Sequence, residues 1–64
     1  MTMCLSTVYT VQGEEKQLLC KNIAAVKTDG DRLVFTDIMG IPTVVSAAIE
    51  RIDFMDNFIY IRQQ

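Results

Sequence analysis

The sequence predicts an all-β domain, a small and highly curved antiparallel sheet or barrel of about six short strands. Three observations lead to this prediction. Short runs rich in Val, Ile, Thr, Tyr and Phe alternate with turn residues along the whole chain. The dipeptide Asp29-Gly30 is a strong hairpin signal, and Asp56-Asn57 separates two further apolar runs. Because the 64 residues contain no repeat, linker or low-complexity tract, residues 1–64 are expected to form one domain.

Polar turn residues divide the first half of the chain into short strands. Residues 5–11 are rich in Thr, Val and Tyr, and Gly13 among polar residues ends this run. Residues 16–21 are expected to form the second strand of a hairpin with the first. Asn22 tolerates turn conformations, so we expect it to separate this strand from a third one over residues 23–28.

A two-residue turn at Asp29-Gly30 would set the pairing of the next hairpin. Thr28 would then lie opposite Asp31. The apolar pairs of this register are Val26 with Leu33 and Ala24 with Phe35, and these four residues are expected to form the core side.

The second half of the chain begins with a break at residues 37–40, and Pro42 is tolerated only at the start or edge of a strand. An extended segment over residues 43–54 follows. Residues 46–52 could also form a helical turn or two, because Ala, Glu and Arg favour helix. We prefer the strand, since a turn at Asp56-Asn57 would pair Phe54 with Ile59 and Ile52 with Ile61 on one strongly apolar face.

Composition limits the classes of function. Half of the residues are apolar, a high proportion for so small a core, and this predicts a homodimer. The net charge is -2 and the six basic residues are scattered singly, which disfavours nucleic-acid binding. No apolar run approaches the ~20 residues of a membrane helix, and the start lacks the basic region of a secretory signal. We therefore expect a cytoplasmic protein with free thiols and no membrane partner.

Most candidate sites have a simpler structural interpretation. The chain has no histidine, no Ser-His-Asp set and no Gly-rich phosphate loop, so we expect no enzyme activity. The acidic pair Glu14 and Glu15 is expected to be a solvated turn, and Cys20 to pack as a small buried hydrophobe. The aromatic residues could form a stacking platform for bases, but core or dimer contacts are preferred because no arginine is interleaved among them; they are Tyr9, Phe35, Phe54, Phe58 and Tyr60.

Cys4 is the residue with the clearest potential for chemistry. It lies just before the first predicted strand, where backbone amides are not yet engaged in the sheet. A thiolate together with deprotonated backbone amide nitrogens could form the planar N,S site that nickel(II) and copper(II) prefer. A single cysteine cannot close such a site, but a two-fold dimer would supply a second copy.

The opening residues Met3-Cys4-Leu5-Ser6-Thr7-Val8-Tyr9, the small size, the Asp29-Gly30 hairpin and the stretch over residues 45–53 resemble the CooT family. These are small nickel-binding accessory proteins linked to carbon monoxide dehydrogenase maturation. The resemblance implies a β-rich homodimer that binds nickel(II) through Cys4, with a nickel enzyme or its maturation factors as partners. Family members typically begin at the Met-Cys pair itself, whereas Met1 and Thr2 precede it here. If these two residues belong to the native chain, a free amine on Cys4 is not available, and the expected ligands are its thiolate and backbone amides.

Two other functions remain open. Relatives in this family also carry the label of predicted RNA-binding protein, so a small RNA-binding module is one alternative. A structural dimer without a ligand is the other.

Overall fold

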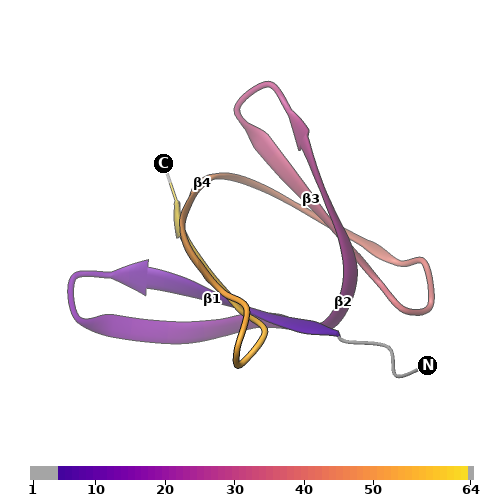
Figure 1. The fold of residues 1–64 in the computed structure, drawn as a ribbon. Coiled ribbons are helices and arrows are strands. Elements are labelled where there is room, and N and C mark those ends of the chain that lie inside the picture. The colour runs from indigo at the N-terminus through magenta and orange to yellow at the C-terminus, as the bar shows by residue number, and fades with distance from the viewer. Residues whose placement is uncertain (1–4, 64) are drawn as a thin grey trace.

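The computed structural model describes residues 5–63, which form five strands. They are β1 (Ser6–Gln12), β2 (Glu15–Asp29), β3 (Arg32–Asp37), β4 (Pro42–Asp53) and β5 (Phe58–Gln63). The strands close into a barrel in the order β1-β2-β3-β4-β5, as Figure 1 shows. Consecutive strands are antiparallel, whereas β1 and β5 pair in parallel and thereby close the sheet. The predicted all-β, curved sheet is confirmed.

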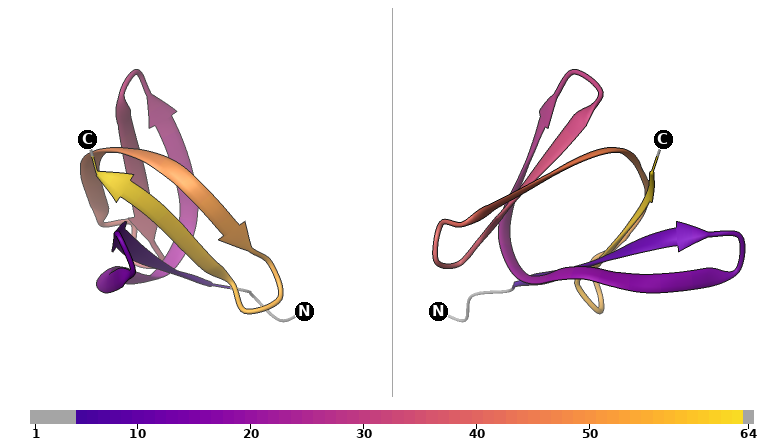
Figure 2. Two further views of the ribbon diagram at one scale, coloured as in Figure 1. Left: turned by 90° about the vertical axis from the view of Figure 1, so that its left-hand side faces the viewer. Right: turned by 180° about the vertical axis from the view of Figure 1, so that it is seen from behind.

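The structure has five strands instead of about six because β2 runs through Asn22 without ending. Asn22 adopts a positive φ of 59°, which asparagine tolerates better than most residues. The pairing of β2 with β1 shifts between Ser6↔Ile23 and Val8↔Cys20, so that β2 carries an extra residue at this point. A bulge of this kind bends a strand, and Figure 2 shows the curvature of β2. The predicted turn at Asn22 is therefore a bend inside one long strand.

The hairpin between β2 and β3 has a different register from the predicted one. Its turn consists of Gly30 and Asp31, because Asp29 pairs with Arg32. Gly30 has a φ of 61°, and a type II′ turn requires positive φ only at its first central residue. With the turn moved by one position, each partner moves by two, so Val26 pairs with Phe35 and not with Leu33.

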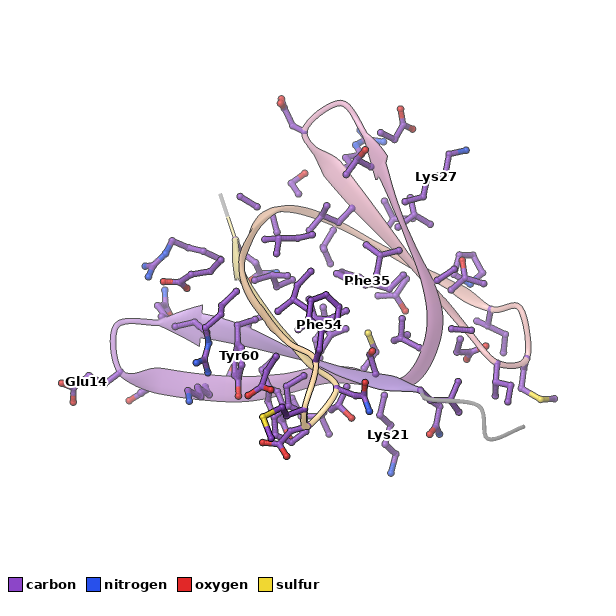
Figure 3. All side chains as sticks on the ribbon, in the orientation of Figure 1. Glu14, Lys21, Lys27, Phe35, Phe54 and Tyr60 are labelled. Atoms are coloured by element: carbon purple, nitrogen blue, oxygen red, sulfur yellow. The ribbon has the colours of Figure 1, made fainter. Side chains whose placement is uncertain are left out.

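The core fills the inside of the barrel and draws side chains from all five strands. Figure 3 shows Phe35 pointing into this enclosed space, and Phe35 has no exposed surface. The prediction that Leu33 and Phe35 are core residues is therefore correct. Val26 and Ala24 are not buried: Val26 lies on the part of β2 that no longer pairs with β1, and Ala24 is the extra residue at a register shift. The buried cluster consists of Val8, Ile23, Leu33, Phe35, Ala47, Ile59 and Ile61.

The hairpin between β4 and β5 also differs from the prediction. Segment 43–54 is a strand, with Pro42 at its start, but the strand ends at Asp53. Asp53 pairs with Phe58, which leaves a four-residue loop over residues 54–57 instead of a two-residue turn. Ile52 consequently pairs with Ile59, and Phe54 is 82% exposed in the loop.

Candidate functional site

The predicted metal ligand Cys4 lies outside the described residues, and the structure describes the strand that follows it. Ser6 pairs with Ile23 of β2, and Thr7 pairs with Phe58 of β5. The Thr7 amide also donates a hydrogen bond to the carbonyl of Asn57, in the loop between β4 and β5, at 2.9 Å. The residues just after Cys4 are thus held by two neighbouring strands and one loop.

The other cysteine, Cys20, is half-buried and packs against the core cluster. Burial raises the pKa of the Cys20 thiol, and the negative charge of Asp37 raises it further. Both causes favour the neutral thiol over the thiolate. Since a metal ligand must be a thiolate, Cys20 is poorly suited to that role near neutral pH.

Two aspartates use their carboxylates to hold loops. Oδ1 of Asp37 accepts hydrogen bonds from the amides of Met39 and Ile41, each at 2.9 Å. Oδ1 of Asp53 accepts one from the amide of Met55 at 3.0 Å. Within residues 5–63, no three His, Cys, Asp or Glu side chains gather closely enough to hold a metal ion.

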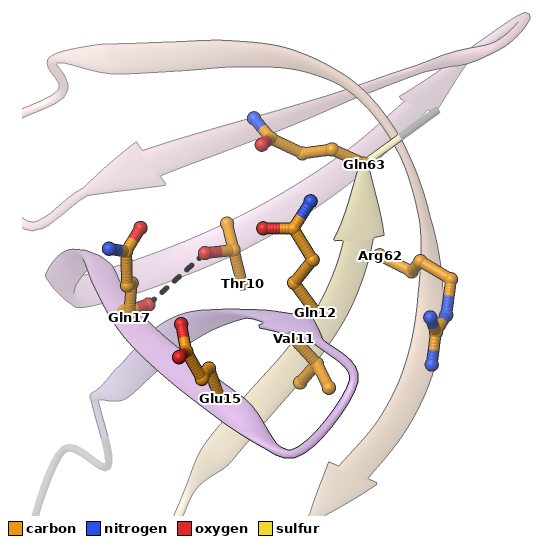
Figure 4. A pocket seen from close by; sticks show the side chains of 7 residues that line it. All are labelled: Thr10, Val11, Gln12, Glu15, Gln17, Arg62 and Gln63. Carbon is orange, nitrogen blue, oxygen red and sulfur yellow. Dashed lines mark hydrogen bonds between the residues drawn. The ribbon is translucent and has the colours of Figure 1, made fainter.

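A polar cavity of about 220 Å³ opens where β1 and β5 diverge. Figure 4 shows Thr10, Gln12 and Gln63 around this opening, with a hydrogen bond of 3.4 Å from Thr10 Oγ1 to the Gln17 carbonyl. Neutral hydroxyl and amide groups predominate, and Arg62 is engaged with Glu50 at 2.8 Å. The cavity lacks soft metal donors; it is lined by Thr10, Val11, Gln12, Glu15, Gln17, Arg62 and Gln63.

A second cluster lies on the outer face of β1 and β5 and combines aromatic rings with cations. Tyr60 stacks on Tyr9 with ring centroids 5.9 Å apart, and Phe58 meets Tyr9 edge-on at 5.3 Å. Lys16 Nζ lies 4.8 Å from the centroid of the Tyr60 ring, and Arg51 Cζ lies 4.6 Å from it. The expectation that no arginine is interleaved among the aromatic residues is wrong, because β4 brings Arg51 beside Tyr60.

No signal in the sequence identified this cluster. Lys16 and Tyr60 belong to strands that are not neighbours, and Arg51 reaches Tyr60 only through the pairing of β4 with β5. Two of the aromatic residues considered together do not belong to it. Phe35 lies in the core and Phe54 in an exposed loop.

Residues 5–63 contain no helix long and apolar enough to span a membrane. Comparison with solved structures finds a match to the crystal structure of a protein assigned provisionally to CooT from Carboxydothermus hydrogenoformans. The TM-score is 0.88 at 21% sequence identity, over 95% of this chain and 98% of that chain. This match shows that the two proteins share a fold.

Comparison with curated proteins gives no match. The family model described as CO dehydrogenase accessory protein CooT matches residues 3–62. That range spans nearly the whole chain and includes Cys4. The chain belongs to the CooT family of CO dehydrogenase accessory proteins.

Proposed function

We propose that this protein is a cytoplasmic nickel-binding accessory protein that acts in the maturation of carbon monoxide dehydrogenase, and that Cys4 supplies the metal ligand. The observation that carries the proposal is the match of the family model to residues 3–62, which include Cys4. The chemistry agrees with it. Without histidine, a site that selects nickel(II) over hard cations needs thiolate, and the chain has two cysteines.

The environment of Cys20 supports the choice of Cys4. The Cys20 thiol has a raised pKa and packs against the core. Metal binding there would require a thiolate, and burial disfavours this charged form. Cys4 precedes β1, and its neighbouring amides are candidates for the remaining ligands.

We further propose that the protein is a homodimer in which two Cys4 thiolates share one nickel ion. Phe54 and Met55 are 82% and 94% exposed in the loop between β4 and β5, and such apolar loops are typical of interfaces. The same loop contacts the start of β1 through the hydrogen bond from Thr7 to Asn57. An interface on this loop would therefore bring two chain starts together, with Cys4 three positions before Thr7.

The metal site is tested by titrating the metal-free protein with nickel(II). We expect thiolate-to-nickel charge-transfer absorption that saturates at one ion per two chains and is accompanied by proton release. The Cys4→Ser variant should lose this absorption, and the matched Cys20→Ser variant should keep it. Wild-type nickel affinity in Cys4→Ser would refute the proposal, and so would loss of binding in Cys20→Ser with an intact fold.

The dimer is tested by sedimentation of the metal-free protein at micromolar concentration. Met55→Ser should weaken association by about tenfold or more, because it removes a buried apolar side chain from the interface. Met39→Ser is the matched control, since Met39 is 80% exposed in the other aspartate-held loop. A monomeric wild type would contradict both the dimer and the shared metal site.

RNA binding is the alternative that the same variants separate from metal binding. It should fall steeply with salt, because it depends on phosphate contacts, and it should persist in Cys4→Ser. Nickel binding through thiolate should depend little on salt and should be lost in Cys4→Ser.

A further inference from the structure

Two positive side chains converge on the ring of Tyr60 from opposite sides of the β1–β5 pair. Arg51 comes from β4, whose register partner at this position is Tyr60. Lys16 comes from β2, where it pairs with Val11 of β1. Their charged groups lie 4.6 Å and 4.8 Å from the centroid of the same ring. Cation–π attraction favours this arrangement, so the ring helps to position both cations.

A β-bulge brings Arg51 to this position. The pairing of β4 with β5 shifts between Ile49↔Ile61 and Arg51↔Tyr60, so that Glu50 is the extra residue. Without the shift, Arg51 would lie opposite Ile59, a core residue. Bulges that redirect a side chain in this way are frequent beside functional sites.

The Tyr60 ring is itself held in place. It is 7% exposed, stacks on Tyr9, and meets the Phe58 ring edge-on with centroids 6.2 Å apart. Tyr60 does not belong to the core cluster inside the barrel, so these aromatic side chains form a separate packed layer on the outer face. Both cations therefore rest on a rigid base.

Among residues 5–63, the positive charges at this site have no ion-pair partner. Within the part of the chain that the structure describes, neither Lys16 nor Arg51 has a carboxylate oxygen within 4.0 Å. Glu50 lies beside them, but its Oε1 accepts a hydrogen bond from Arg62 Nη2 at 2.8 Å, so its charge is already offset. Two cations thus lie over one ring and concentrate positive charge at this place on a chain of net charge -2.

The two cations also line one cavity. It has a volume of about 310 Å³ and is lined by Val11, Lys16, Glu50, Arg51 and Tyr60. The methyl groups of Val11 and the aromatic ring supply an apolar wall. The cavity therefore suits a small molecule that has both an anionic group and an apolar part.

We propose that this cavity binds the phosphate group of a small organic phosphate between Lys16 and Arg51. A phosphate monoester carries a charge of about -1.5 to -2 at pH 7, which matches two unpaired cations, whereas a carboxylate would neutralise only one. The guanidinium of Arg51 can donate two parallel hydrogen bonds to phosphate oxygens, and the Lys16 ammonium adds a point charge. The site is distinct from Cys4 chemistry and does not depend on the proposed metal function.

Nucleic acid is a poorer occupant of the same cavity. Base stacking needs an exposed ring face, and Tyr60 is almost wholly buried beneath the cations. A strand of RNA also needs a series of cations along its backbone, and the remaining basic residues of this chain are few and scattered.

The proposal is tested by titrating the metal-free, full-length protein with adenosine monophosphate, inorganic phosphate and adenosine at low ionic strength. Backbone amide NMR shifts report where each compound binds. We expect the monophosphate to saturate shifts at Val11, Lys16, Arg51 and Tyr60, and adenosine to leave them unchanged. Saturation by inorganic phosphate with equal affinity assigns the ligand as free phosphate, whereas tighter binding of the monophosphate assigns an organic phosphate.

Charge-matched variants decide whether the cavity is responsible. Arg51→Gln and Lys16→Gln should each raise the dissociation constant by about tenfold or more, as expected for loss of a charge-assisted hydrogen bond. Lys27→Gln makes the same change of charge on the distant β2–β3 hairpin, where Figure 3 shows Lys27 pointing away from the barrel, and it should bind as the wild type does.

Four results would overturn the proposal. They are an equal loss of affinity in Lys27→Gln, binding of adenosine as tight as that of its monophosphate, binding seen only with RNA oligonucleotides, and no saturable shift at the cavity with either phosphate. The amide spectra of the same variants verify that each is folded, so a loss of binding cannot be mistaken for unfolding.

Discussion

Replacing Asn22 by valine tests whether β2 bends at a residue with left-handed backbone conformation. Asn22 is exposed, so core packing does not determine the effect of the substitution on stability. Two physical effects predict changes of opposite sign in the free energy of unfolding. If residue 22 were an ordinary strand position, valine should be neutral or stabilising, because β-propensity favours it over asparagine by up to about 1 kcal/mol. At a φ of 59°, valine should instead cost about 1–2 kcal/mol, because a β-branched residue is strongly disfavoured in this region whereas asparagine, whose short polar side chain can hydrogen-bond locally, adopts it readily.

The structure therefore predicts that Asn22→Val lowers the free energy of unfolding by about 1–2 kcal/mol. For a domain of this size, 1 kcal/mol corresponds to a shift of about 4–8 °C in Tm. The bend also positions the carbonyl of Asn22, which accepts a hydrogen bond from the amide of Ile38 at 2.9 Å. Loss of the bend should therefore loosen the loop between β3 and β4 as well.

Urea unfolding at one fixed protein concentration measures the effect, because the stability of the proposed dimer would depend on concentration. Asn22→Gly is the informative companion, since glycine accepts positive φ and should change stability by no more than about 0.5 kcal/mol. Thr28→Val provides the control at a regular, exposed position of the same strand and should be close to neutral. The reasoning is refuted if Asn22→Val is as stable as the wild type or more stable.

Three further predictions concern Cys20 and its neighbour Asp37. Cys20→Ala should cost about 1 kcal/mol in urea unfolding and leave nickel affinity unchanged, because the side chain only packs against the core; the converse pattern would make Cys20 a metal ligand. The raised pKa of Cys20 means that the folded chain keeps a proton that the unfolded chain loses, so the free energy of unfolding should fall as pH rises through the ordinary thiol range and towards the folded pKa. This fall in the free energy of unfolding at alkaline pH should be smaller in Cys20→Ala. An identical pH profile in the two proteins would show that Cys20 does not cause the fall. In a Cys4→Ser background, Asp37→Asn should lower the pKa of Cys20 in a thiolate absorbance titration, but only part of the way to the ordinary value because burial is the larger cause.

The sequence alone determined the fold class and the family. Alternating β-branched and aromatic residues predicted the all-β fold, and Pro42 predicted the start of a strand. The Met-Cys opening and its surroundings pointed to CooT, and the family match agrees. These features are local in the chain, so they can be recognised from the sequence without knowledge of distant contacts.

Registers were less predictable because turn residues mark where a hairpin lies without showing which two residues are central. Asp29-Gly30 suggested one turn, whereas the pairing of Asp29 with Arg32 makes Gly30 and Asp31 the central residues, and the positive φ of Gly30 fits the first of these positions. In the last hairpin, the carboxylate of Asp53 closes a four-residue loop by accepting the amides of Met55 and Asp56. In the register that goes with this loop, Ile52 pairs with Ile59 and not with Ile61.

Only the tertiary structure placed Lys16 and Arg51 over Tyr60. The three residues lie on β2, β4 and β5, and they meet because β1 and β5 pair in parallel to close the barrel and a bulge redirects Arg51. Sheet closure and bulges depend on the energy of the whole packed sheet, and no local run of residues encodes them. The choice of Cys4 as metal ligand came from the sequence alone and stays a prediction, whereas the cationic cavity arises from contacts between segments far apart in the chain.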